Sequence, residues 1–236
     1  MTKFYSFAPR SSHNKLEKVA FEFLGLSLLE PLSTLMNWVL ATQCFIFFLR
    51  LRGTENKFQK YWSWFFLAYT ISLIFGGFSH LLYNYTGMLG KIPGWSVAAI
   101  GIVAAESAML LDVQDPKKRQ MLLTVVRSKL FATFMLLIID LSFKWVMVHT
   151  AGFFLLAGLL SWSRFKEGQT NYKYFLYGMA GLFVMAGVKV GQVDIHPAWF
   201  NRDDIAHVIM LGMYYLFFLG VKGYGTSPKS AQATIE

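Results

Sequence analysis

The sequence has little charge. Only 15% of its 236 residues are Asp, Glu, Lys or Arg, whereas about a quarter of a soluble domain is charged. Hydrophobic residues make up 55% of the chain. This composition excludes an ordinary soluble protein and predicts an integral membrane protein. Because a helix needs about 20 apolar residues to cross the hydrocarbon layer, the chain has room for about seven spans joined by short loops.

Cysteine is nearly absent as well. The single residue, Cys44, lies within an apolar run, so an intramolecular disulfide is excluded. A cleavable signal peptide is not expected, because residues 1–29 mix charged and apolar positions without a continuous apolar core. Apolar residues from Leu16 to Phe23 recur at helical spacing. Residues 1–29 are therefore predicted to be an interfacial amphipathic segment containing a helix.

The rest of the chain is predicted to form an all-α domain of seven transmembrane helices, residues 30–222, followed by a polar tail, residues 223–236. The stretch 121–162 is too long for one span, and Asp140 and Lys144 interrupt it. We interpret it as two spans joined by a tight turn, and six spans with a buried irregular segment is the alternative. The other expected spans are residues 30–49, 62–83, 95–111, 174–190 and 203–221.

The formal net charge of +9 does not indicate a nucleic-acid partner, because the basic residues sit in short segments between apolar runs. Most of the 22 Lys and Arg follow the first, third and fifth expected spans or lie in the tail. Basic loops stay on the cytoplasmic side of a membrane. We therefore expect the C-terminus in the cytoplasm and the N-terminus outside. Short loops without processing signals favour a bacterial inner membrane.

Polar residues inside a membrane are costly, so they are functional, paired or close to an interface. With the expected orientation, nearly all of the intramembrane ionisable groups fall in the outer leaflet. Glu106, deeper in the third span, is the main exception. The outer group comprises Glu30, His80, Asp140, Lys144, His149, Lys189, Asp203, Asp204 and His207.

The start of the last expected span has the most informative spacing. Asp203 and Asp204 lie four and three residues before His207, so either acid shares a helix face with it. Acids in a first turn also cap free N–H groups, which is the structural explanation. If His80 faces them, two imidazoles and a carboxylate meet at one depth, as in a catalytic zinc site. The spacing does not decide which of the two acids supplies the carboxylate.

Three segments resemble the alkaline ceramidases. Glu30–Asn37, with the sequence EPLSTLMN, is similar to the start of the first transmembrane helix in that family. Gly76–His80 resembles the second-helix segment that ends in a zinc-binding His, and Asp203–His207 resembles the seventh helix, where two His bind zinc. The wider group is the CREST superfamily of seven-helix membrane proteins, and a bacterial branch of unknown function is similar too. The resemblance implies a zinc-dependent hydrolase acting on an amide or ester bond of a membrane lipid. The zinc ligands it implies are His80, Asp203 and His207, and Asp204 is the expected catalytic partner, which would orient an imidazole.

Under this resemblance, Glu30 and Asn37 hold the first span against the site. The sequence departs from the ceramidase pattern where Asp203 replaces a His and Gly76 replaces a Ser, and the third-helix catalytic Asp has no clear counterpart. The alternative is a non-catalytic seven-helix protein, a receptor-like sensor or a subunit of a larger membrane complex, with a structural polar cluster. A transporter would use Glu106, but inverted repeats are not evident. A retinal protein would need a Lys that the last span lacks.

Overall fold

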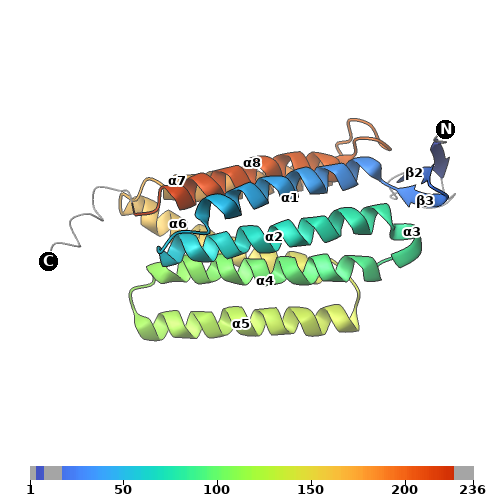
Figure 1. Cartoon of the computed structure of the whole chain (residues 1–236). Coiled ribbons are helices and arrows are strands. Elements are labelled where there is room, and N and C mark those ends of the chain that lie inside the picture. Colours follow the sequence, from blue (N-terminus) through green and yellow to red (C-terminus); the bar gives the residue numbers. More distant parts are fainter. Residues whose placement is uncertain (1–3, 8–17, 226–236) are drawn as a thin grey trace.

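The computed structural model describes residues 4–7 and 18–225. Within these residues, seven helical segments are long and apolar enough to cross a membrane, so the chain is an integral membrane protein built as a helical bundle (Figure 1). The predicted spans are confirmed. The long helices are α1 Pro31–Leu51, α2 Lys57–Leu81, α4 Ile92–Met109, α5 Pro116–Ile139, α6 Lys144–Lys166, α7 Tyr172–Val190 and α8 Arg202–Lys222.

Three short helical elements lie next to α4 in the chain. Helix α3, Tyr83–Thr86, follows α2, and the 3₁₀ turns η1, Leu89–Lys91, and η2, Leu110–Asp112, extend α4 at its two ends. The stretch 121–162 is indeed two helices, so the six-span alternative is wrong. Asp140 adopts an extended conformation that ends α5, and its carboxylate pairs with Lys144 at 2.5 Å across the turn.

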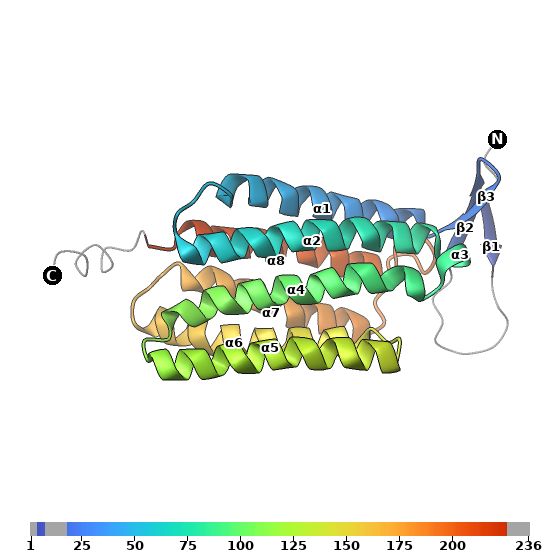
Figure 2. The same ribbon diagram turned by 60° about the horizontal axis from the view of Figure 1, so that its bottom comes forward.

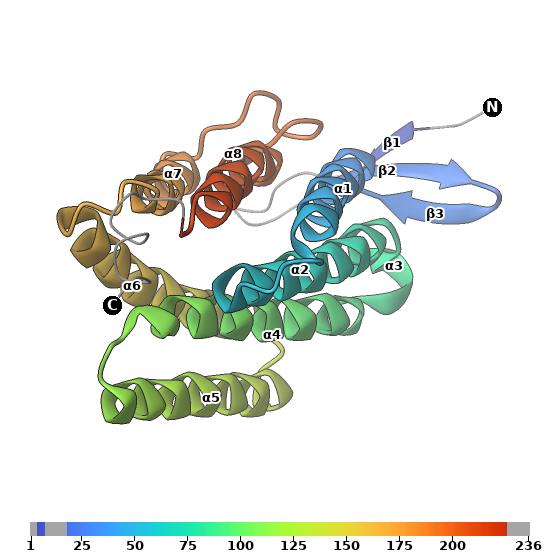
Figure 3. The ribbon, with the colours of Figure 1, turned by 60° about the vertical axis from the view of Figure 1, so that its left-hand side comes forward.

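Six of the spans form a ring, and the seventh lies outside it. The ring runs through α1, α2, α4, α6, α7 and α8, each packed against the next, and α1 also contacts α8. Helix α5 packs only on the outside of α4 and α6, as Figure 3 shows. Accordingly, 17% of the apolar window of α5 is buried, against 56% for the span that contains α4. Most of α5 therefore faces lipid.

Aromatic side chains fill the half of the bundle in which α2 and α7 begin. The buried Trp62 ring lies 5.3 Å from the ring of Phe175 and 5.7 Å from that of Phe217. Glycines make room for this layer, because a Cβ at Gly178 would lie only 2.5 Å from the Phe217 ring, and one at Gly220 only 2.7 Å from the Phe175 ring. This layer is part of the hydrophobic core of the bundle.

The N-terminal segment is a β-sheet where the sequence predicted a helix. Val19, Phe21 and Phe23 recur at every second position, and over so short a run this spacing fits a strand as well as a helix. Leu24 and Gly25 have φ of 51° and 77°, which is the conformation of a two-residue hairpin turn. Residues 16–17 of the expected helix and 226–236 of the expected tail lie outside the described residues. The strands are β1 Phe4–Phe7, β2 Lys18–Phe23 and β3 Leu26–Leu29, antiparallel in that order.

Candidate functional site

The predicted site residues gather at the end of the bundle where α1 and α8 begin and α2 ends (Figure 2). Ser33 and Asn37 are four residues apart, which places them on one face of α1. Glu30 immediately precedes the helix and has φ 49° and ψ 57°, a left-handed conformation that is uncommon for a residue with a Cβ. Such local strain is concentrated at functional sites.

His80 is oriented by Glu30. Its Nδ1 lies 2.9 Å from Glu30 Oε2, and the two side chains are 21% and 14% exposed. When Glu30 is ionised it can only accept hydrogen bonds, so Nδ1–H is the donor and Nε2 of a neutral ring holds the lone pair. None of the described residues hydrogen-bonds to Nε2. The imidazole is therefore fixed with its second nitrogen available.

The tautomer of His207 is fixed in the same way. Its Nδ1 lies 2.7 Å from the backbone carbonyl of Asp203, which can only accept, so Nδ1–H is again the donor. Nε2 then accepts a hydrogen bond from Asn37 Nδ2 at 3.1 Å. The same amide donates to the carbonyl of Ser33 at 2.8 Å. His80 and His207 lie within electrostatic range of each other, and each presents Nε2 as an electron-pair donor.

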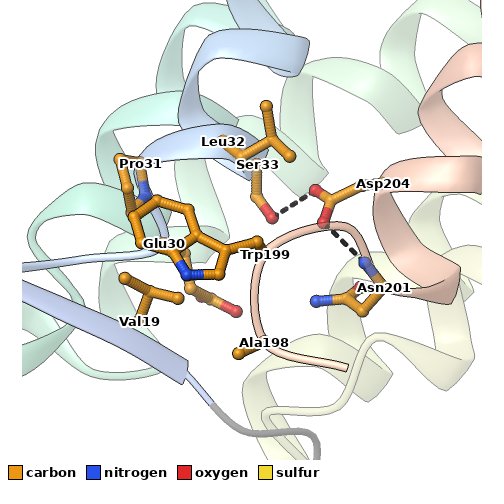
Figure 4. A pocket seen from close by; sticks show the side chains of 9 residues that line it. All are labelled: Val19, Glu30, Pro31, Leu32, Ser33, Ala198, Trp199, Asn201 and Asp204. Atoms are coloured by element: carbon orange, nitrogen blue, oxygen red, sulfur yellow. Dashed lines mark hydrogen bonds between the residues drawn. The ribbon is translucent and has the colours of Figure 1, made fainter. Parts of the chain in front are cut away.

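Asp204 holds the start of α8 against α1. Its Oδ1 accepts the hydroxyl hydrogen of Ser33 at 2.7 Å, and its Oδ2 accepts the backbone N–H of Asn201 at 3.1 Å (Figure 4). In turn, the Asn201 side chain accepts a hydrogen bond from the backbone of the first turn of α8, and the two interactions form a capping box. Asp204 is only 1% exposed. Asp204 therefore has the structural role of capping α8. Its partner Ser33 was not among the residues predicted from the sequence.

The side chain of Asp203 forms an ion pair with α7. Its Oδ1 lies 3.0 Å from Lys189 Nζ, and the two side chains are 44% and 51% exposed. The pair joins the end of α7 to the start of α8. Across residues 4–7 and 18–225, no group of three His, Cys, Asp or Glu side chains has the spacing to hold a metal. Of the three predicted zinc ligands, His80 and His207 lie at the same end of the bundle within electrostatic range of each other, and Asp203 is paired with Lys189.

A small pocket opens beside the hydrogen bonds of Asp204. Glu30 and Ser33 line one side, and Ala198 and Trp199 from the loop between α7 and α8 line the other (Figure 4). Its volume of about 10 Å³ is at the lower limit for one water molecule. The pocket therefore admits water next to the carboxylates but no larger ligand in this conformation.

The loop over the pocket is itself held in place. Asp194 accepts hydrogen bonds from the backbone N–H of Arg202 at 2.7 Å and from its guanidinium at 2.9 Å. Partial burial raises the pKa of Asp194, but the hydrogen bonds and charge of Arg202 outweigh it and lower the pKa below its usual value. This carboxylate stays ionised down to acidic pH, so the loop remains tied to α8.

Comparisons with known proteins place the chain in a family. The matching family model covers residues 32–226 and is described as a family of unknown function, DUF6962. The chain belongs to this family. No curated protein matches it. The DUF6962 region contains Asn37, His80, Asp203, Asp204 and His207. The resemblance to the ceramidases stays a prediction that rests on its motifs.

Gly76, which stands where the ceramidases have a Ser, faces the site of this DUF6962 chain. A Cβ built at this position would lie 2.8 Å from Asn37 Oδ1. The residue is thus one turn before His80 and directly opposite the amide that contacts His207. Gly76 therefore supplies no side-chain group at this position.

A second polar cluster lies deeper in the bundle, between α4, α5 and α6. Lys129 Nζ, from the outer helix α5, lies 2.5 Å from Glu106 Oε1 and donates to the carbonyl of His149 at 2.9 Å. Glu106 Oε2 is buried without a hydrogen-bond partner among the described residues. His149 Nε2 lies 3.1 Å from the carbonyl of Ala99. Glu106 was singled out from the sequence, whereas Lys129 was not, because it lies two residues after Arg127 near the basic start of the stretch 121–162 and nothing local marks its pairing with Glu106.

Proposed function

We propose that the chain is a metal-dependent hydrolase embedded in the membrane, which acts on an amide or ester bond of a lipid. The observation that carries the proposal is the hydrogen-bonding arrangement that the rings of His80 and His207 have in common. Both rings donate Nδ1–H to an oxygen and present Nε2 as an electron-pair donor. Metal-binding histidines have this arrangement, because the hydrogen bond at one nitrogen fixes the tautomer and makes the other nitrogen a stronger ligand.

The donor set suits zinc, which binds imidazole nitrogen and carboxylate oxygen. His80 and His207 would supply two ligands once the Asn37 amide turns aside. Asp203 is the third ligand we propose, because its exposed ion pair with Lys189 is weak and easily exchanged. When bound, zinc would supply a Lewis acid that polarises a carbonyl group and acidifies water.

The surrounding residues have supporting roles in this proposal. Glu30 keeps the His80 ring in one orientation, and Asp204 with Ser33 fixes the start of α8, which carries His207. The site lies within a bundle whose outer faces are apolar, so a substrate that reaches it from the bilayer is a lipid. Basic loops at the opposite end support a cytoplasmic C-terminus and an outer-leaflet site. The short loops favour a bacterial inner membrane.

Metal content tests this proposal. Protein purified in detergent and loaded with zinc should retain one zinc ion per chain after desalting, and His80→Ala and His207→Ala should each lose it. His196→Ala is the matched control, because it removes an exposed imidazole from a loop at the same end of the molecule. The loaded parent should also release fatty acid from lipids with amide-linked or ester-linked acyl chains.

Two outcomes would contradict the proposal. Zinc absent from the parent, or retained equally in both histidine variants, would rule out the site. A zinc-loaded protein that hydrolyses neither class of lipid would rule out the activity. In either case the second candidate gains support, a non-catalytic sensor or subunit of a membrane complex. The observation in its favour is that Asn37, Ser33 and Asp204 already satisfy one another across α1 and α8.

Replacing Glu30 with glutamine tests the orientation of His80 separately. The amide keeps the size of the side chain but removes the charge that supports the ring. Changes of this kind behind a metal-bound histidine weaken metal binding by about 10–100-fold. Zinc titration of Glu30→Gln against the parent measures the change. Glu22→Gln, an exposed acid in β2, is the control, and equal affinity in all three proteins would show that Glu30 has no such role.

A further inference from the structure

The tip of the β2–β3 hairpin exposes a cluster of large apolar side chains. Phe23 is 55% exposed, Leu24 87% and Leu26 46%, and with Gly25 they form the whole turn. Hairpin turns are usually built from Asn, Asp and Gly, because these residues accept the required backbone angles and remain soluble. A turn made of Phe, Leu and Leu is suited to an apolar environment outside the chain.

Leu24 also carries backbone strain. Its φ of 51° lies in the left-handed region, where the Cβ of an ordinary L-residue is unfavourable. An Asn at this position would relieve part of the strain and expose less apolar surface. The sequence instead has a strained and exposed leucine, and with 87% of its surface exposed its contacts within the described chain are few. Strain of this kind points to a functional contact.

Polar contacts fix the hairpin at the end of the bundle. The backbone N–H of Ser27 donates to the hydroxyl of Tyr85 at 2.9 Å, and Asn84 Nδ2 donates to Ser27 Oγ at 3.1 Å. Tyr85 belongs to α3, directly after α2 leaves the bundle, where tyrosines mark the boundary between membrane and water. Figures 1 and 2 show the strands at this end, and in Figure 2 they run across the direction of the helices.

We propose that the hairpin tip, Phe23–Leu26, inserts into the lipid surface between headgroups and acyl chains. The residue pair directly behind the tip, Glu22 and Ser27, is polar and exposed, so it would remain among the headgroups and water. An apolar tip backed by polar residues, and held level with interfacial tyrosines, matches the gradient of polarity across a bilayer surface. This contact does not depend on a metal at His80.

Spin labelling tests the contact in the full chain. A nitroxide is attached at Leu24→Cys, with Glu22→Cys as the control site, in a Cys44→Ala background reconstituted into phosphatidylcholine vesicles. The label at position 24 should collide more with oxygen, which concentrates in hydrocarbon, and less with a water-soluble nickel chelate than the label at position 22. The native Cys44 is fully buried, so its replacement leaves the surface unchanged.

A second variant separates insertion from any effect of the label on the turn. With the nitroxide at Leu26→Cys, adding Leu24→Asn keeps a residue suited to the left-handed conformation but removes the apolar side chain. The label should then become more accessible to the nickel chelate. Equal nickel accessibility at positions 22 and 24 would overturn the proposal. Spin–spin broadening that disappears on dilution with unlabelled protein would also overturn it, because the tip would then contact a second copy of the chain.

Discussion

Replacing Lys129 with methionine is expected to destabilise the bundle by about 3–5 kcal/mol, the usual loss when one partner of a buried ion pair is removed. Lys129 reaches from α5 to Glu106, whose side chain is only 2% exposed. Gly152 makes room for it, because a Cβ there would lie 3.1 Å from Lys129 Nζ. Without the ammonium group, Glu106 is left in the membrane with neither oxygen paired to a side chain, and α5 loses its main polar contact with the ring.

Denaturant unfolding in detergent measures this loss, and a second substitution tests its cause. Lys129→Met combined with Glu106→Leu should recover most of the stability, because an apolar pair of similar volume often replaces a buried ion pair at little cost. Lys144→Met is the control, since its pair with Asp140 is about half exposed and should contribute at most about 1 kcal/mol. Equal stability of the two single variants would show that Lys129 does not hold α5.

Replacing Asp112 with alanine is expected to have the second largest effect. This residue ends the third span, is 7% exposed, and accepts hydrogen bonds from the hydroxyls of Tyr172 and Tyr224. Its backbone carbonyl accepts a further bond from Arg164. The carboxylate therefore connects the end of the third span to the start of α7 and to the residues just after α8, while the backbone carbonyl adds the contact with α6. Losing a charged acceptor and leaving the buried Tyr172 hydroxyl unpaired should cost about 2–4 kcal/mol.

A double-mutant cycle with Tyr172→Phe isolates this interaction. If the hydroxyl of Tyr172 is stabilising because of Asp112, Asp112→Ala should cost less in the Tyr172→Phe background than in the parent. Unfolding in denaturant measures the free energy of each variant. Asp115→Ala provides a comparison, because this acid caps the start of α5 and its loss should cost about 1 kcal/mol. Strictly additive effects of the two substitutions would contradict a direct contribution of the pair.

The N-terminal hairpin shows where sequence patterns are least decisive. Residues 18–23 are too few to separate a period of two from a helical period, and Leu24 is not a usual turn residue. The hairpin forms because β2 pairs with strands on both sides and its partner β3 is fixed to Tyr85. The contact between Ser27 and Tyr85 joins residues 58 positions apart, so no local pattern could predict it.

The candidate site was predictable in part. Spans that alternate in direction bring the start of α1, the end of α2 and the start of α8 to one end, so Glu30, Asn37, His80 and His207 were expected together. Neighbouring residues on a helix point about 100° apart, however, and the sequence does not say which of Asp203 and Asp204 turns inward. Ser33 and the end of α7 decide this, because the hydroxyl binds Asp204 and Lys189 binds Asp203.

The low charge of the chain, the feature with which its composition first departs from that of soluble proteins, determined that it is a membrane protein with about seven spans, and six stayed possible until the structure divided residues 121–162 into two helices. Apolar length alone sets this result, because each span must cover the same hydrocarbon thickness whatever its neighbours are. The tertiary structure decided which polar groups are paired. The Nδ1 hydrogen bond of His207 is local to α8, whereas the pairs Lys129–Glu106, Asp112–Tyr172 and His80–Glu30 each join different elements of the bundle. Such contacts arise from the order in which the helices pack, which the apolar pattern of each helix does not specify.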